Sequence, residues 1–282
     1  MTILPERLAA ACRGVPERTA WLEQLPKAVQ EMVGRWSLSF GSPWSASCAW
    51  VVPAVRDDGS HVVLKLGMPH MEAADEIEGL RFWDGNPTVR LLEADSNLNA
   101  LLLERCEPGT SLRDLPETKQ DLVLAELFHR LWRKPPARHP FRPLSLMITS
   151  WMEETVAARS KWRDVGLVRA GLRVFEELAQ ASSEDVLLAT DLHAGNVLRA
   201  QREPWLVIDP KPFVGDRAYD ATQHLFNCKA RMCAAPRATI RRFATLLDVD
   251  DERVRMWMFA RSAAEPRDCW TDDSLALARA LA

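Results

Sequence analysis

The chain has 282 residues, of which 47% are hydrophobic and 27% are charged. This balance is typical of a globular protein and excludes a mostly disordered chain. The formal net charge of -3 gives no general attraction to nucleic acid or to an anionic membrane surface. The N-terminal residues lack the apolar core of a signal peptide, and no apolar stretch approaches the roughly 20 residues needed to span a bilayer. We therefore expect a cytoplasmic protein without a nucleic-acid or membrane partner.

The cysteines show no C-x-x-C pair and no spacing to histidine that is typical of a zinc site. We interpret them as free thiols in a reducing compartment. The six are Cys12, Cys48, Cys106, Cys228, Cys233 and Cys269.

Residues 1–105 are predicted to form a small β-rich domain with N-terminal helices. Apolar residues recur at three- and four-residue steps over the first forty residues, which predicts helix. Two β-branched runs, 48–55 and 61–66, flank an Asp-Gly turn and predict a hairpin. A helix and two further strands are then expected at 71–83, 89–93 and 100–105.

Residues 106–282 are predicted to form a larger, mainly helical domain. Helical periodicity covers 121–132, 145–162, 168–181 and the chain from residue 219 onward. Short strands are expected at 186–189, 197–200 and 205–208. The whole chain is thus predicted to have an α+β fold, with a small β-rich part and a larger helical part.

The motif that carries chemistry is A-T-D-L-H-A-G-N-V-L-R-A-Q-R-E-P-W-L-V-I-D-P, residues 189–210. Asp191 and Asn196 lie five residues apart in a loop, and Asp209 follows a hairpin that should return the chain to Asn196. An amide oxygen beside a carboxylate suits Mg²⁺, and Asp191 can accept a proton from an incoming hydroxyl. This spacing matches the catalytic and metal loops of kinases. The alternative is a polar loop in which these residues cap turns.

Lys65 lies inside the apolar strand V-V-L-K-L. Strand alternation puts Val62 and Leu64 on one face and Lys65 on the other. A buried ammonium needs a partner, and nucleotide phosphates together with a helix glutamate would supply one. We favour Glu76 for that glutamate, with Glu72 as the second candidate. The alternative is an edge-strand lysine whose ammonium reaches solvent.

The chain resembles the aminoglycoside phosphotransferase family, in particular its branch of streptomycin 6-kinases and hydroxyurea phosphotransferases. The likeness lies in T-D-L-H-A-G-N-V-L, W-L-V-I-D-P and V-G-D-R-A-Y-D, at 190–198, 205–210 and 214–220. Weaker agreement extends over roughly residues 40–265. The resemblance implies a bilobal protein-kinase-like fold and a small-molecule kinase that uses ATP and Mg²⁺. It also implies a hydroxyl acceptor, with an aminoglycoside such as streptomycin expected and hydroxyurea or a sugar as the alternative.

The family's functional residues can be carried over to matching positions. The resemblance implies that Asp191 is the catalytic base, that Asn196 and Asp209 bind Mg²⁺, and that Lys65 binds the nucleotide phosphates. It further implies that the backbone from Glu104 to Cys106 forms the hinge that contacts adenine.

Two departures from the family pattern keep an inactive, pseudokinase-like binding module open as an alternative. The family usually has His-Gly directly before the catalytic aspartate, where this chain has Ala189-Thr190. The loop expected over the nucleotide, F-G-S-P-W-S-A-S at 40–47, has one glycine and three serines. A protein kinase is disfavoured because no A-P-E segment follows Asp209.

Two polar residues are expected to support the catalytic loop. His193 should orient the loop by hydrogen bonding, and the family resemblance gives Asp220 a similar part. The alternative for each is a turn or helix cap.

A cationic acceptor would require carboxylates near Asp191. The candidates are Asp216 and Glu265, with Glu153 or Glu154 on the mid-chain helix. The alternative is that these residues are solvated surface charges. The sequence does not indicate the oligomeric state.

Overall fold

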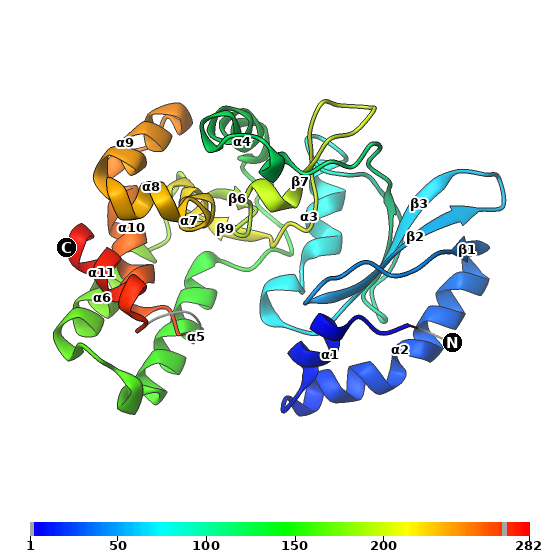
Figure 1. The fold of residues 1–282 in the computed structure, drawn as a ribbon, viewed down its shortest axis with the longest axis horizontal. Coiled ribbons are helices and arrows are strands. Elements are labelled where there is room, and N and C mark those ends of the chain that lie inside the picture. Colours follow the sequence, from blue (N-terminus) through cyan, green and yellow to red (C-terminus); the bar gives the residue numbers. More distant parts are fainter. Residues whose placement is uncertain (1–2, 267–269) are drawn as a thin grey trace. The chain divides into compact units, whose positions relative to one another are not determined.

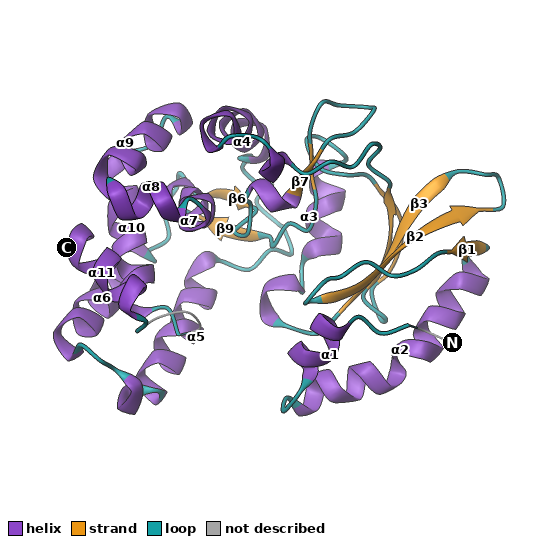
Figure 2. Cartoon of the chain, viewed as in Figure 1, coloured by secondary structure: helices purple, strands orange, loops and turns teal. Residues whose placement is uncertain are grey.

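The structure is a computed structural model that describes residues 3–266 and 270–282, so Cys269 lies outside the described residues. The chain divides into two compact units. The first comprises residues 1–110 and 198–208, and the second comprises 111–197 and 209–282. Their helices and strands are distinguished in Figure 2.

The first unit is built on a five-stranded sheet with the strand order β1-β2-β3-β5-β4. The predicted hairpin is present, because β2 and β3 pair antiparallel with Val52 opposite Leu64. The strands are β1 (Leu38–Phe40), β2 (Ala49–Arg56), β3 (His61–Gly67), β4 (Leu91–Asp95) and β5 (Ala100–Glu104). The short β1 was not predicted from the sequence, since three residues carry too little pattern to identify a strand.

Alternate residues of β3 face two separate hydrophobic cores, as its side-chain period of two requires. Val62 and Leu64 pack in the core that includes residues of α1 (Glu6–Cys12) and α2 (Pro16–Arg35). Val63 packs on the opposite face with residues of α3 (Glu76–Trp83). Figure 1 shows α1, α2 and α3 around this sheet. The predicted helix over 71–83 is interrupted, because its start is a separate 3₁₀ turn, Met71–Ala73.

The hairpin of β7 (Val197–Leu198) and β8 (Leu206–Val207) is present, but it belongs to a different unit from the one predicted. The predicted division at residue 105 put it with the helical part, whereas its residues 198–208 pack with the first unit. Leu206 is fully buried in the core that contains Val63. Arg202 also forms an ion pair with Glu104 at 2.9 Å. These contacts, distant in sequence, explain the difference.

The second unit is helical around one two-stranded sheet. The sheet pairs β6 (Val186–Leu188) with β9 (Phe213–Gly215), and β9 was not predicted. The helices are α4 (Glu117–Leu131), α5 (Leu144–Ala157), α6 (Val165–Leu178), α7 (Arg217–Asn227), α8 (Lys229–Ala234), α9 (Pro236–Leu247), α10 (Asp251–Ala264) and α11 (Asp272–Leu281). The predicted helix over 145–162 ends early, at Ala157, and a 3₁₀ turn follows at Arg159–Lys161.

Aromatic side chains from four helices pack together in the second unit. The Tyr219 and Trp257 rings meet edge to face with centroids 5.2 Å apart. Phe175 packs against Trp257 and Trp151 at 6.2 and 6.4 Å. Such pairs stabilise by about 0.5–1.5 kcal/mol beyond burial, so this cluster fixes α5, α6, α7 and α10 to one another.

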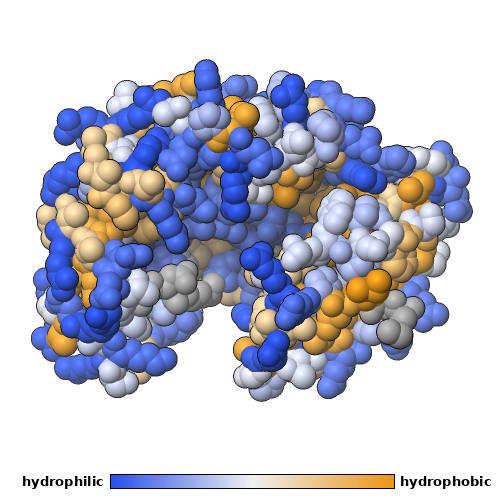
Figure 3. Space-filling model, viewed as in Figure 1, coloured by the Kyte–Doolittle hydropathy of each residue, from blue (hydrophilic) through white to orange (hydrophobic). Residues whose placement is uncertain are grey.

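No helix in the described part of the chain is long and apolar enough to cross a membrane. On the face drawn in Figure 3, hydrophilic residues are interspersed with hydrophobic ones. The five described cysteines are free thiols, as predicted, and Cys12, Cys106 and Cys228 are buried.

Candidate active site

The catalytic and metal loops of the motif run side by side because β6 and β9 pair. Leu188 lies opposite Phe213, and the pairing continues into the loops. The Lys211 amide donates to the Ala189 carbonyl at 2.9 Å, and the Thr190 hydroxyl donates to the Lys211 carbonyl at 2.6 Å. Asp191 and Asp209 thus lie on two segments that backbone contacts hold together.

Thr190 occupies a backbone conformation that suits glycine. Its φ is 42°, in the left-handed region where a β-branched residue is strained. This backbone conformation explains why the family usually has glycine at this position, since glycine adopts a positive φ without strain. In this chain the Thr190 hydroxyl bond and a bond from its amide to Asp220 Oδ1, at 2.7 Å, hold the conformation.

Asp220 supports the catalytic loop from α7, as expected. Besides Thr190, its carboxylate accepts hydrogen bonds from the Ala189 amide at 3.1 Å and from Trp132 Nε1 at 2.9 Å. The Asp220 side chain is fully buried, and burial raises its pKa to about 6. Three donors on one carboxylate provide loop support in a chain that lacks the family's histidine at position 189.

His193 orients the same loop, which confirms the expectation. Its Nδ1 accepts a hydrogen bond from the Gly195 amide at 3.0 Å. Burial, with the Arg113 guanidinium nearby, lowers the pKa of His193 to about 4, so the ring is neutral at physiological pH. A Cβ on Gly195 would lie 2.4 Å from Arg113 Nη2 and 2.7 Å from His193 Cε1, so any larger residue there would force these side chains to move.

Asn196 is held in one amide orientation. Its Nδ2 donates to the Asp191 carbonyl at 3.0 Å. Because a carbonyl can only accept, this bond identifies Nδ2 and leaves Oδ1 as the atom that can bind a metal ion. Asn196 and Asp209 flank the β7–β8 hairpin, one before β7 and the other after β8.

Asp191 has the electrostatics of a proton acceptor. Burial raises the pKa of its carboxyl to about 6, Lys211 and Arg261 oppose that rise, and Asp209 adds to it. Gln223 donates from Nε2 to Asp191 Oδ1 at 2.8 Å. A carboxylate with a pKa near the working pH both ionises readily and binds a proton effectively.

Lys211 is a site residue that sequence reasoning missed. Its side chain is 7% exposed, and its Nζ lies 2.5 Å from Asp209 Oδ1. Lys211 is thus a counter-ion of the Asp209 carboxylate. The Asp209 carboxylate and the Asn196 amide oxygen are both hard oxygen donors of the kind that Mg²⁺ prefers. The available signal was a lysine two residues after the strand-ending aspartate.

In the first unit, Lys65 and Glu76 form a buried ion pair. The Lys65 Nζ lies 2.6 Å from both carboxylate oxygens, with side-chain exposures of 7% and 1%. This is the pair preferred from the sequence. Glu72, the second candidate, contacts His70 at 3.1 Å. β3 lies between β2 and β5, which excludes an edge-strand lysine.

Glu104 and Cys106 are predicted to lie in the hinge. The Glu104 side chain is hydrogen-bonded within the protein, and the Cys106 side chain is buried. The Glu104 carboxylate bonds to Arg202 and accepts the Arg90 amide at 3.0 Å. Burial raises the pKa of the Cys106 thiol to about 12, which keeps it protonated. Any contact with a nucleotide would therefore involve the backbone.

Asp216 and Glu265, the predicted substrate carboxylates, have internal partners. Asp216 caps α7 by accepting the Ala218 amide, and it also binds Trp257 Nε1 at 2.6 Å and Arg253 Nε at 2.5 Å. Glu265 accepts two bonds from Arg261, at 2.7 and 3.3 Å. Both carboxylates serve structural contacts, which leaves the expected substrate contact without support.

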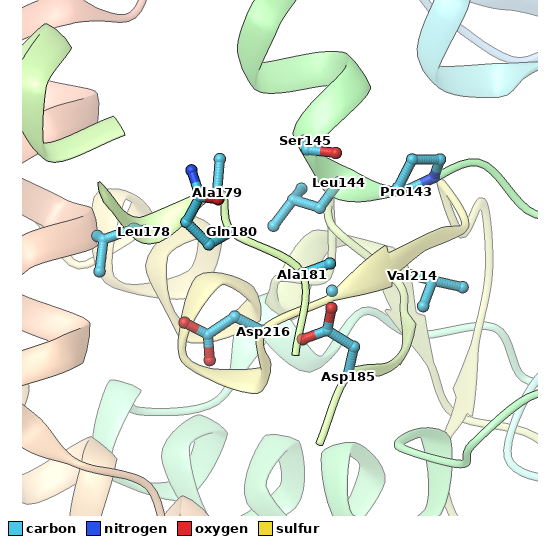
Figure 4. Close-up of a pocket in the computed structure, with 11 residues that line it drawn as sticks. Pro143, Leu144, Ser145, Leu178, Ala179, Gln180, Ala181, Asp185, Val214 and Asp216 are labelled. Carbon is cyan, nitrogen blue, oxygen red and sulfur yellow. The ribbon is translucent and has the colours of Figure 1, made fainter. Parts of the chain in front are cut away.

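Two hollows in the second unit do not locate an acceptor. Figure 4 shows the smaller one, where the carboxylates of Asp185 and Asp216 lie beside it. Its volume of about 20 Å³ is room for about one water molecule. A groove of about 790 Å³ runs along α5 and α6 and includes Glu153. Neither hollow is lined by Asp191, Asn196 or Asp209.

The structure also gathers Asp121, His224 and Cys228 into a buried group whose ligand atoms lie within 4.8 Å of one another. The sequence reasoning missed this set, although His224 and Cys228 are four residues apart. The Arg231 guanidinium occupies it, with Nη1 2.7 Å from Asp121 Oδ2 and Nη2 3.0 Å from Cys228 Sγ. Burial raises the pKa of Cys228 to about 11. A cation and a protonated thiol make this a structural network rather than a metal site.

A small antiparallel sheet with a buried lysine–glutamate pair, together with a helical unit carrying these two loops, defines the protein-kinase-like class of fold. A choline kinase from Streptococcus pneumoniae has that fold and is similar in structure, with a TM-score of 0.60 at 12% sequence identity over 92% of this chain and 97% of the other. The predicted α+β, kinase-like fold is thus confirmed.

Residues 35–273 match the model of the aminoglycoside/hydroxyurea antibiotic resistance kinase family. The chain is 35% identical over 274 residues to a streptomycin 6-kinase of Streptomyces glaucescens, which covers 92% of this chain and 88% of the relative. It is also 35% identical over 246 residues to a hydroxyurea phosphotransferase of Kitasatospora aureofaciens, covering 86% and 72%. The chain belongs to this kinase family, which confirms the predicted enzyme class, a phosphotransferase.

Proposed function

We propose that this enzyme transfers the γ-phosphate of ATP to a hydroxyl of an aminoglycoside of the streptomycin type. The observation that carries the proposal is the pair of tied loops that present Asp191 beside Lys211 and Asp209. The similarity to a streptomycin 6-kinase over most of both chains supports the choice of acceptor.

Nucleotide binding falls to separate groups in this proposal. Lys65, whose Nζ contacts both carboxylate oxygens of Glu76, binds the phosphates. Burying an ion pair costs solvation free energy, and such costly buried charges are often found at functional sites. The backbone from Glu104 to Cys106 contacts adenine. Asn196 Oδ1 and the Asp209 carboxylate would hold Mg²⁺, which when bound neutralises charge on the phosphates.

In the transfer step, Asp191 orients the acceptor hydroxyl and takes its proton. A bond forms between the acceptor oxygen and the γ-phosphorus, while the bond from that phosphorus to the bridging oxygen breaks and ADP leaves. The proton remains on Asp191 until it passes to solvent. Throughout this step the Lys211 ammonium stabilises the negative charge of the neighbouring carboxylates, since it lies against Asp209 Oδ1.

The test is an ADP-release assay with Mg·ATP and streptomycin, with the product examined by mass spectrometry. We expect one phosphoryl group per acceptor and one ADP per product. Asp209→Ala should weaken Mg²⁺-dependent ATP binding in a calorimetric titration, because the site loses its carboxylate. No ADP release with any acceptor would favour the inactive binding module. Unchanged metal dependence in Asp209→Ala would make Asp209 a strand cap.

A neutral acceptor such as hydroxyurea is the second candidate. It is favoured by an equally similar hydroxyurea phosphotransferase and by the internal partners of Asp216 and Glu265. Attraction of a multivalent cation weakens with ionic strength, whereas binding of a neutral molecule does not. A kcat/KM for streptomycin that falls with added salt supports the cationic acceptor, and turnover of hydroxyurea alone overturns it.

A further inference from the structure

Gln223 connects Asp191 to a buried arginine. Its Nε2 donates to Asp191 Oδ1 at 2.8 Å, and its Oε1 accepts from Arg261 Nη2 at 3.1 Å. Gln223 was not singled out by the sequence. It lies 32 residues from Asp191 and 38 from Arg261, so only the fold brings the three together.

The orientation of the Gln223 amide follows from its two partners. A guanidinium can only donate hydrogen bonds, and an ionised carboxylate can only accept them. Arg261 therefore selects the amide oxygen, and the NH₂ group must point to Asp191. An amide held at only one end could turn over, but this one is fixed at both.

Arg261 is itself immobilised. Its Nη1 donates to Thr222 Oγ1 at 2.6 Å, and its Nε donates to Glu265 Oε2 at 2.7 Å. The rings of Trp151, Tyr219 and Phe226 surround the guanidinium carbon at 4.9–5.5 Å. Its side chain is 6% exposed. A group restrained on this many sides gives Gln223 a fixed anchor.

The face of α7 that carries Gln223 also holds the rest of the loop. Residues three and four apart share a helix face, and Gln223 lies three after Asp220 and next to His224. Asp220 binds the loop amides, and His224 Nε2 lies 2.9 Å from Asp121 Oδ1. This face is therefore anchored to the loop on one side and to α4 on the other.

We propose that Gln223 is a positioning residue that holds Asp191 Oδ1, with its amide orientation set by Arg261, so that Asp191 Oδ2 is presented to the acceptor hydroxyl. This inference rests on the proposed function, in which Asp191 is the base. A carboxylate tied at one oxygen has one defined direction for the other, which fixes the geometry of proton transfer.

Gln223→Glu tests the inference most directly. Glutamate keeps the size of the side chain and an oxygen for Arg261, but it cannot donate to Asp191. We expect kcat for streptomycin to fall about 10- to 100-fold, the scale of misplacing a catalytic group. The affinity for Mg·ADP, measured by calorimetry, should stay within about twofold because Gln223 has no part in nucleotide binding.

Thr222→Val is the matched control. It removes another bond to Arg261 from the adjacent residue, with no contact to Asp191. We expect it to lower the melting temperature but to keep kcat. If Thr222→Val lowers kcat as much as Gln223→Glu does, Gln223 merely holds Arg261 in place and the inference is overturned.

A double-mutant cycle separates this inference from the proposed function. A residue that acts through Asp191 should add no further loss of kcat in an Asp191→Asn background, whereas independent effects multiply. An undiminished effect in that background, or wild-type kcat in Gln223→Glu, overturns the positioning role. If Asp191→Asn alone turns over like the wild type, the proposed function fails, and that result is seen without any Gln223 variant.

Discussion

Asp191, which is partly buried, and Asp121, which is fully buried, lie in the same unit, yet the pKa values of their carboxyl groups shift in opposite directions. Burial raises the pKa of Asp191 to about 6. Asp121 is fully buried, and its burial also acts to raise its pKa, but hydrogen bonds from Arg231 and His224 hold that pKa well below its usual range. Burial alone therefore does not decide the charge of a carboxyl group.

The difference lies in the donors that reach each carboxylate. Asp121 is contacted by Arg231 through two nitrogens, at 2.7 and 2.8 Å, and by Arg242 at 3.3 Å. The side chain of Asp191 receives a neutral amide, from Gln223. Opposite charges in direct contact favour ionisation, whereas a neutral donor compensates burial only in part. Asp121 is thereby held as an anion, whereas Asp191 keeps a raised pKa of about 6, which suits the proton acceptor that we propose.

The largest expected effect is on stability, from Asp121→Asn. This change leaves Arg231 and His224 without their buried anion, which should lower the free energy of unfolding by about 3–5 kcal/mol. Denaturant unfolding measures the loss. Glu117→Gln is the control, because Glu117 contacts the same Arg231 at 2.5 Å but its side chain is 35% exposed. It should cost less than about 1 kcal/mol. Equal losses of unfolding free energy in the two variants would mean that the burial of Asp121 does not cause its larger contribution to stability.

Asp191→Asn should lower kcat by about 10² or more, the scale for removing a general base. The fold and the affinity for Mg·ATP should persist, because Asp191 acts on the acceptor. Steady-state kinetics and calorimetry measure both. Asp185→Asn is the control, since burial also raises the pKa of Asp185 but its side chain accepts the Ser182 amide elsewhere in the unit. A similar loss of kcat in Asp185→Asn would contradict a specific role for Asp191.

The raised pKa of Asp191 predicts two pH effects of intermediate size. The base must be ionised, so kcat/KM should rise with pH through about 6. Because the folded pKa exceeds the unfolded value of about 3.9, the stabilisation from protonated Asp191 is full below that value and is lost as pH rises through about 6.

Asp191→Asn removes this dependence without altering that of Asp220. Its melting temperature should therefore exceed that of the wild type by a few degrees well above the Asp191 pKa and approach it below that pKa. A constant difference at every pH, measured by thermal scans, would assign the gain to another cause.

The smallest effect is expected from Thr190→Val, which removes the hydroxyl bond to the Lys211 carbonyl while keeping the shape of the side chain. Losing that bond in a buried position should cost about 1–3 kcal/mol. Thr245→Val is the control, because the exposed Thr245 hydroxyl bonds within its own helix, to the Arg241 carbonyl. It should change stability by no more than about 0.5 kcal/mol. A comparable cost in both would indicate a general effect of losing a hydroxyl.

The sequence alone determined those features that depend on local pattern. The alternation around Lys65 predicted which face of β3 carries the lysine, because the side-chain period of a strand is two residues. Glu72 and Glu76, four residues apart on one helix face, were the two glutamates predicted as possible partners of Lys65. The D-x-x-x-x-N spacing and the strand-ending Asp209 predicted the catalytic and metal loops, because such motifs combine residue type with backbone geometry.

The tertiary structure decided which charged and polar groups meet. Glu265 and Asp216 read as open carboxylates in the sequence, but arginines from α10 bind them. Gln223 looked like an ordinary helix residue until the fold brought it to Asp191. Hydrogen bonds and ion pairs act over a few ångströms between residues that can be far apart in the chain. Their pairing is therefore set by the packing of helices and strands, which no local pattern in the sequence encodes.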